Sequence, residues 1–212
     1  MADALVLYTN PQSRGRVARW MLEEVGQPYK TELLDYASTM KSAPYLAVNP
    51  MGKVPALRHG DMVVTENAAI CAYLADVFPQ AKLAPPPGDQ RRGPYYRWMF
   101  FTAGPVEYAV SNKALGFTVP PERERMIGYG TVARALDTLE AAISAAPYLA
   151  GDAFTAADLY VGSHLGFGMM FGTIDRRPAF EQYWQRLASR PACVRANELD
   201  DAAAAALKKA AG

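Results

Sequence analysis

Ser13, Arg14 and Arg16 place one hydroxyl and two guanidinium groups within four residues of one another. They lie between a strand-like run at residues 5–8 and a helix-like run at residues 17–25. A helix N-terminus carries free N–H groups and the positive end of the helix dipole, so these side chains together would stabilise an anion. The alternative is that Ser13 is only the N-cap of the helix, the commonest role of serine at such a place.

Two further positions are candidates for binding a ligand through main-chain groups. Val54-Pro55 ends an irregular segment just before a strand-like run, and a cis bond before proline costs only about 0.5–1 kcal/mol. We expect a sharp turn at Pro55 that leaves the N–H and C=O of Val54 free to pair with an extended peptide. A rigid turn without a ligand is the alternative. Glu66 and Asn67 open a helix-like run, where they would cap the helix, lie beside a ligand carboxylate bound by its amides, or do both.

The charge and hydropathy of the chain exclude several classes of function. Its 22 basic and 21 acidic residues give a net charge of +1, so no broad attraction to nucleic acid or anionic lipid is expected. No apolar run approaches the roughly 20 residues of a membrane span, and the start lacks the pattern of a secretory signal. We therefore expect a cytoplasmic protein with no nucleic-acid and no membrane partner.

The cysteines and histidines are too scattered to form a metal or redox motif. Cys71 and Cys193 form no CxxC pair and have no histidine at ligand spacing, so we expect reduced thiols in the core and no metal site. His59 and His164 are each isolated and are assigned no chemistry.

The first 80 residues alternate between strand and helix patterns. Strand-like runs at residues 5–8, 29–34, 54–57 and 63–65 and helix-like runs at residues 17–25 and 66–78 give the order βαβ, then ββα. We predict a first domain at residues 1–80.

A proline-rich segment at residues 81–89 separates this part from a second half with helical patterns only. Its prolines cannot continue a helix, so we predict a linker there and an all-helical domain at residues 90–212. The alanine-rich end, residues 202–211, has helix propensity but little to bury. Thr155-Ala-Ala-Asp158 has the form of a capping box, which starts a helix rather than performing catalysis.

Three motifs in this order resemble the cytosolic glutathione transferase family. Residues 49–57 (NPMGKVPAL) are similar to its NPxGxVPxL loop, Glu66-Asn67 resembles its Glu-Ser pair, and residues 150–160 resemble its second-domain folding motif. The resemblance spans the whole chain. It implies an α/β thioredoxin-like N-terminal domain (βαβ-ββα) and an all-α C-terminal domain.

The resemblance also implies a binding site for glutathione as co-substrate. The tripeptide would pair with Val54 beside Pro55, its γ-glutamyl end would bind at Glu66 and Asn67, and its glycyl carboxylate would meet Lys53 or Lys41. For each lysine, an ordinary solvated position is the alternative. No metal is implied.

For activation of the thiol, the resemblance leaves three candidates. Ser13 ranks first, as a hydroxyl donor at the helix N-terminus assisted by Arg14 or Arg16. Tyr8 ranks second, because tyrosine-type members carry their tyrosine before an Arg-Gly-Arg, although here the spacing to Arg14 is six rather than about four. Asn10 ranks third. Counting back from Arg16 in serine-type members gives Pro11, which has no hydroxyl, so the class is unassigned.

The function implied is a transferase that activates glutathione as thiolate and conjugates it to hydrophobic electrophiles in detoxification. Candidates for the electrophile site, between the domains, are Met99, Phe100, Phe101, Tyr108 and residues 167–171, unless they belong to the core. The alternatives are a glutathione-dependent peroxidase or disulfide reductase, and a non-catalytic glutathione-binding module. The resemblance implies a homodimer.

Overall fold

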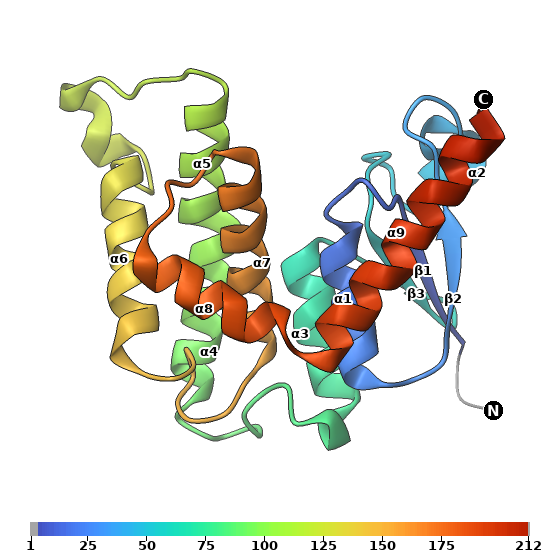
Figure 1. Cartoon of the computed structure of the whole chain (residues 1–212), viewed down its shortest axis with the longest axis horizontal. Coiled ribbons are helices and arrows are strands. Elements are labelled where there is room, and N and C mark those ends of the chain that lie inside the picture. The colour runs from blue at the N-terminus through green and yellow to red at the C-terminus, as the bar shows by residue number, and fades with distance from the viewer. Residues whose placement is uncertain (1–3, 212) are drawn as a thin grey trace. The chain divides into compact units, whose positions relative to one another are not determined.

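The computed structural model describes residues 4–211 and divides into two compact units (Figure 1). The first unit consists of residues 4–81 together with residues 189–211, and the second consists of residues 82–188. No helix in the described part of the chain is long and apolar enough to cross a membrane.

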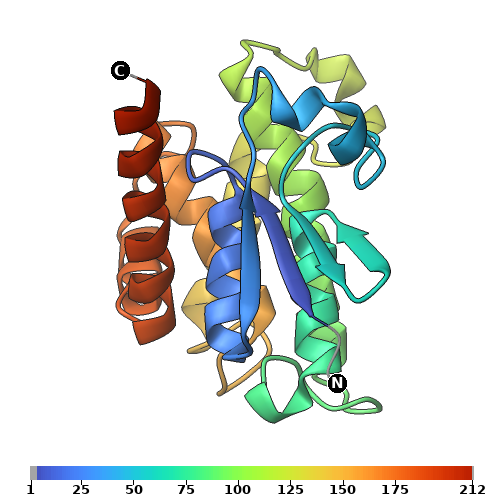
Figure 2. The same cartoon turned by 90° about the vertical axis from the view of Figure 1, so that its right-hand side faces the viewer.

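The first unit is built on a four-stranded mixed sheet with the order β2-β1-β3-β4. β1 (Leu5–Thr9) pairs in parallel with β2 (Tyr29–Leu33) and antiparallel with β3 (Ala56–His59), which forms a hairpin with β4 (Met62–Thr65). The predicted βαβ-ββα order is therefore confirmed, although β3 begins two residues later than the predicted strand at residues 54–57. Figure 2 shows this sheet facing the viewer with α1 behind it.

Three long helices complete the first unit. α1 (Gly15–Val25) packs against β1 and α3 (Asn67–Val77), and α9 (Pro191–Ala211) lies along α1 (Figures 1 and 2). The sequence assigns α9 to the helical domain, whereas the contacts of the described residues place it in the first unit. The segment between β2 and β3, which shows no regular pattern in the sequence, contains a short 3-10 turn η1 (Thr39–Lys41) and α2 (Ala43–Leu46).

The ends of α1 follow from two glycines. Gly26 takes a left-handed conformation (φ 71°) and its N–H bonds to the carbonyl of Leu22, which ends the helix. At the other end, a Cβ on Gly15 would lie 1.9 Å from Oγ1 of Thr9, so the backbone of α1 approaches β1 more closely than any other residue allows. The helix begins at Gly15, two residues earlier than its apolar pattern predicts.

The regular elements described in the second unit are all helical, as predicted, apart from an isolated bridge between Tyr148 and Gly151. The elements of this unit are α4 (Arg92–Phe101), a π-helical segment η3 (Thr102–Val106), α5 (Glu107–Ala114), a 3-10 helix η4 (Pro121–Met126), α6 (Val132–Ala145), α7 (Ala156–Phe171) and α8 (Pro178–Ala188). Between α4 and α5 the structure has η3, where Pro105 lacks the N–H that a regular helix needs.

The predicted capping box starts α7. The side chain of Thr155 accepts from the backbone of Asp158, whose own carboxylate accepts from the N–H of Thr155 at 2.8 Å. Asp158 is fully buried and also accepts from the N–H of Leu149 and the hydroxyl of Tyr183. Burial raises the pKa of Asp158 despite these donors. Its hydrogen bonds tie the start of α7 to Leu149 and to Tyr183 of α8.

Candidate functional site

The loop before β3 leaves one residue of main chain open. The Val54–Pro55 bond is cis, as predicted. The carbonyl of Lys53 accepts from the hydroxyl of Tyr45 at 2.6 Å and from the amide of Asn49 at 2.8 Å. Neither the N–H nor the C=O of Val54 makes a hydrogen bond to another residue within 4–211. The loop is therefore held firmly on the side of Lys53, while Val54 presents an unpaired donor and acceptor.

The two candidate lysines differ in what they contact. Nζ of Lys41 donates to the carbonyl of Gly52 at 2.7 Å, so this lysine holds the loop. Gly52 has φ 57°, and a Cβ there would lie 3.0 Å from the same Nζ, which explains why glycine occupies the position. The side chain of Lys53 is exposed and forms no ion pair or hydrogen bond with the described residues.

Glu66 begins the second side of the site in an unusual backbone conformation. Its φ is 66° and its ψ is 121°, a region that costs a non-glycine residue about 1–3 kcal/mol. Its carbonyl accepts the first helical bond of α3, from the N–H of Ile70 at 2.9 Å, but its side chain caps no N–H of the helix. The capping alternative for Glu66 is thus not observed. The carboxylate is exposed at the positive end of α3.

Asn67 connects this helix start to the loop before α1. Its Nδ2 donates to the carbonyl of Arg14 at 3.0 Å, and its Oδ1 is buried without a hydrogen-bond partner among the described residues. Asn67 therefore does not cap α3 either. Instead it joins two of the segments that the sequence selects, although they are 53 positions apart.

The hydroxyl of Ser13 is already bonded within its own loop. It donates to the carbonyl of Asn10 at 2.6 Å and accepts from the N–H of Gly15 at 2.9 Å. The N-cap position belongs to Arg14, but the bond from Gly15 satisfies an amide of the first turn in the way a cap does. Ser13 is half-buried and lies at the start of α1, as predicted.

Asn10 is also engaged by the surrounding backbone. Its Nδ2 donates to the carbonyl of Leu34 at 2.7 Å, and its Oδ1 accepts from the N–H of Gln12 at 2.9 Å. The side chain is 5% exposed. It fixes the loop between β1 and α1 to the segment that follows β2.

The side chain of Tyr8 differs from those of Ser13 and Asn10 in its surroundings and in its hydrogen bonding. Successive strand residues point to opposite faces, so Tyr8 lies on the face away from Thr9 and Leu7. It is half-buried against the cluster of Met40, Tyr45 and Ala56, with its ring 5.7 Å from that of Tyr45. Within residues 4–211 its hydroxyl has no hydrogen-bond partner. Val54 packs against the same cluster, so Tyr8 lies on the same side of the sheet as the open main chain.

The guanidinium of Arg16 is engaged by the protein at the helix start. It bonds to the carbonyl of Pro11 and to Asn197 and Asp201 of α9. The sequence contains no local signal for the contacts with α9, because Asn197 and Asp201 lie 181 and 185 positions away. Arg14 is exposed at the same helix start.

The apolar candidates in the second unit separate into core and surface. Met99 and Met169 are buried, and Phe101 and Phe167 are half-buried. Phe100, Tyr108, Met170 and Phe171 are 62–72% exposed. Exposed aromatic and methionine side chains of this size can cover a hydrophobic ligand.

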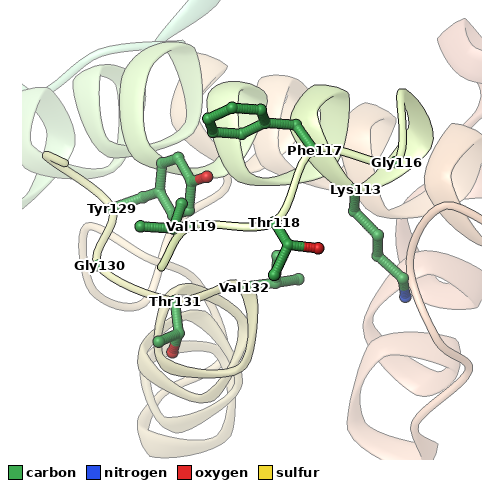
Figure 3. A pocket seen from close by; sticks show the side chains of 9 residues that line it. All are labelled: Lys113, Gly116, Phe117, Thr118, Val119, Tyr129, Gly130, Thr131 and Val132. Atoms are coloured by element: carbon green, nitrogen blue, oxygen red, sulfur yellow. The ribbon is translucent and has the colours of Figure 1, made fainter. Parts of the chain in front are cut away.

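The second unit also has a pocket that the sequence does not indicate. It has a volume of about 320 Å³ and is formed around the connection between α5 and α6 (Figure 3). Its walls carry the side chains of Lys113, Phe117, Thr118, Val119, Tyr129, Thr131 and Val132. The hydroxyl of Tyr129 accepts from Asn112 and Nζ of Lys113 pairs with Asp175, so the polar groups of the pocket are largely satisfied by the protein.

The two thiols lie in the core, as predicted. Cys71 and Cys193 are buried, and burial raises their pKa to about 12 and about 11. His59 is bonded to the hydroxyl of Tyr73 at 2.7 Å. No cluster of three metal-ligating side chains is found among residues 4–211.

The described fold is that of a thioredoxin-like domain followed by a helical domain, and the main chain of Val54 in the first has no hydrogen bond among the described residues. Two family models match the chain. The N-terminal domain model of glutathione S-transferases matches residues 14–77, and the C-terminal domain model matches residues 98–191.

Individual relatives agree with these models. Glutathione S-transferase GST-4.5 of Xanthomonas campestris is 29% identical over 85% of this chain and 91% of its own length. The crystal structure of a glutathione transferase from Methylococcus capsulatus has a TM-score of 0.78 and 31% identity, and covers 93% of this chain and 99% of that one. A sphingomonad glutathione S-transferase solved with glutathione has a TM-score of 0.76 and 29% identity, over 92% and 98% of the two chains. The chain belongs to the glutathione S-transferase family, and is by that membership a transferase enzyme.

Proposed function

We propose that this protein binds glutathione along the edge formed by Val54 and Glu66, activates its thiol as thiolate, and conjugates it to hydrophobic electrophiles. The observation that carries the proposal is the unpaired main chain of Val54. An extended peptide pairs with such a residue through its own N–H and C=O, as in the addition of a strand to a sheet. Glutathione supplies one cysteinyl residue with both groups.

The two ends of the tripeptide fit the charges on either side. The γ-glutamyl end carries an ammonium, which the exposed carboxylate of Glu66 would bind, and a carboxylate, which the amides at the start of α3 would bind. The glycyl carboxylate would meet Lys53, whose side chain is unengaged within the described chain. The ammonium of Lys41, which donates to the carbonyl of Gly52, would add its positive charge to the binding of this carboxylate.

The sulfur would lie at the loop before α1. An unperturbed thiol has a pKa near 8.5, and each unit of lowering requires about 1.4 kcal/mol of preferential stabilisation of the anion. Ser13 is our first choice of donor, because it stands at the positive end of α1. To donate to the sulfur, the hydroxyl of Ser13 would have to release the carbonyl of Asn10. The hydroxyl of Tyr8 has no such bond to break among the described residues, so Tyr8 is retained as the second choice.

The remaining functional assignments follow from the family. We propose that exposed apolar side chains of the second unit, Phe100 and Tyr108 among them, contact the electrophile. We also propose a homodimer that acts in the cytoplasm in detoxification. Gel filtration with light scattering tests the homodimer.

The test of the proposal is binding and turnover by the purified chain. We expect saturable binding of glutathione in calorimetry, and conjugation of a chlorodinitrobenzene-type substrate. Glu66→Gln should weaken binding about tenfold, because a hydrogen bond to a charged partner contributes about 1.5–3 kcal/mol. Asp61→Asn is the matched control, since Asp61 is an exposed carboxylate in the nearby hairpin turn.

The outcomes separate the possible functions. Absence of glutathione binding would reject the proposal altogether. Binding without conjugation across a panel of electrophiles would reject the transferase reaction and leave a binding module. Turnover of hydroperoxides or mixed disulfides alone would assign the thiolate to reduction rather than conjugation.

A further inference from the structure

Arg16 joins the loop before α1 to the C-terminal helix α9. Its Nε donates to the carbonyl of Pro11 at 2.7 Å, its Nη1 donates to Oδ1 of Asn197 at 3.3 Å, and its Nη2 lies 2.5 Å from Oδ1 of Asp201. The Arg16 side chain is 22% exposed, whereas that of Asp201 is 68% exposed. One guanidinium therefore connects a loop near the start of the chain with a helix at its end.

A neighbouring pair fixes the position of α9 along α1. Nε of Arg19 donates to Oδ1 of Asp200 at 2.8 Å, and the two side chains are 5% and 0% exposed. Nη1 of Arg19 also donates to the hydroxyls of Tyr29 and Thr31 on β2. Because a buried charge without its partner is strongly unfavourable, any sliding of α9 along α1 would be opposed. Asp201, the next residue, is thereby held opposite Arg16.

The carbonyl that Arg16 binds is well placed to control the loop. Proline has no N–H, so its carbonyl is the only main-chain hydrogen-bonding group of Pro11. This residue lies between Asn10 and Ser13, and the carbonyl of Asn10 accepts from both the N–H and the hydroxyl of Ser13. A shift of the Pro11 peptide would move the donors that surround the proposed position of the sulfur.

We propose that α9 positions the thiol-binding loop through Asp201, Asn197 and Arg16, and that Arg16 is a positioning residue for thiolate formation. The guanidinium takes its orientation from α9 and transmits it to the Pro11 carbonyl. This inference rests on the proposed function, because it concerns the state of the bound thiol. It gives α9 a role in the chemistry of the first unit in addition to its role in packing.

The test removes the α9 side of the contact and leaves Arg16 in place. In the full-length chain, Asp201→Asn is combined with Asn197→Ala, and Glu198→Gln is the matched control, an exposed carboxylate on the same helix. With a chlorodinitrobenzene-type substrate, we expect kcat to fall about fivefold in the double variant while KM for glutathione changes less than twofold. The acid limb of the pH profile of kcat/KM should move to higher pH. The control should match the wild type in all three.

A second measurement keeps this proposal separate from the proposed function. Hydrogen exchange of the ligand-free protein reports the mobility of the amides of Gln12, Ser13 and Gly15 whether or not the enzyme turns over. We expect several-fold faster exchange there in the double variant and none in Glu198→Gln. Unchanged exchange with an unchanged pH profile would overturn the positioning role. A wild-type chain without activity would reject the proposed function and, with it, the effect of Arg16 on thiolate formation. If the double variant then still showed faster exchange in the loop, only the conclusion that α9 holds the loop in place would remain.

Discussion

The loop before α1 and the edge between Val54 and Glu66 are both proposed to contact glutathione, yet their polar groups are used in opposite ways. In the loop, Asn10 and Ser13 have their side chains bonded to nearby backbone. At the edge, the main chain of Val54 is open within the described chain, and Glu66 has an exposed carboxylate on a strained backbone. The side chains of Asn10 and Ser13 in the loop therefore have hydrogen-bond partners within the protein, whereas the main chain of Val54 at the edge has none among the described residues.

This difference separates binding from activation. Open donors and acceptors at Val54 pair with a peptide without losing bonds in the protein, so that edge is suited to provide affinity. A hydroxyl has one hydrogen, so Ser13 can donate to the sulfur only by releasing the carbonyl of Asn10. Activation by Ser13 therefore exchanges one hydrogen bond for another, and its contribution depends on how much better the thiolate accepts than the carbonyl does.

Ser13→Ala should have the largest effect on turnover. Loss of one donor to a developing anion typically lowers kcat by about 10²–10³-fold, and we expect a value near the lower end because the native donor must first leave Asn10. Binding of glutathione should change less than threefold. Steady-state kinetics and calorimetry measure the two effects.

The same experiment decides between the candidates for the donor. Tyr8→Phe should leave kcat within about threefold if Ser13 donates, and Ser38→Ala controls for the loss of a hydroxyl that is bonded in another loop of the first unit. A Tyr8→Phe variant that loses the activity while Ser13→Ala retains it would transfer the role to Tyr8. The closed loop would then serve only to shape the site.

Gly15→Ala should have the next largest effect, and on stability. The added Cβ would lie 1.9 Å from Oγ1 of Thr9, which is fully buried. Overpacking of this kind costs about 1–3 kcal/mol, and we expect about 2 kcal/mol in the free energy of unfolding. Denaturant unfolding measures the change.

Two comparison variants test the stated cause. Thr9→Ala combined with Gly15→Ala should recover part of the loss, because it removes the atom in collision. Gly93→Ala should cost nothing, since apart from its chain neighbours and the backbone of its own helix no atom lies within 4 Å of the added Cβ. Equal losses at Gly15 and Gly93 would show that the approach of α1 to β1 is not what requires glycine.

The open edge could be predicted from the sequence because its determinants are local. Val54-Pro55 and the start of α3 at Asn67 are set by residues within a few positions of each other. The same holds for the capping box of Thr155 and Asp158, and for the βαβ-ββα order of the first unit.

The closed loop could be predicted only in part. The start of α1 near Ser13 follows from its pattern, but the bonds of Arg16 depend on α9, which the sequence assigns to the other domain. An alanine-rich helix has little apolar surface to indicate where it packs, and its attachment through Asp200 and Asp201 is electrostatic. The charges of α1 and α9 match only once the fold brings the two helices together.

Glu66→Gly should produce the smallest change, and it addresses the open edge directly. Glycine adopts φ 66° without steric cost, so the strain of about 1–3 kcal/mol is relieved, while the greater freedom of glycine in the unfolded chain removes about 0.5–1 kcal/mol of that gain. We expect a net stabilisation of about 1 kcal/mol in denaturant unfolding, together with loss of the glutathione affinity that the carboxylate provides. Glu66→Gln retains the strain and should lose affinity without gaining stability. If Glu66→Gly destabilises the chain, the backbone conformation is not strained and the contrast between the two regions concerns hydrogen bonds alone. If it stabilises the chain and still binds glutathione with full affinity, the side chain of Glu66 is not the partner of the γ-glutamyl ammonium, and the strain at this residue serves the main chain at the start of α3.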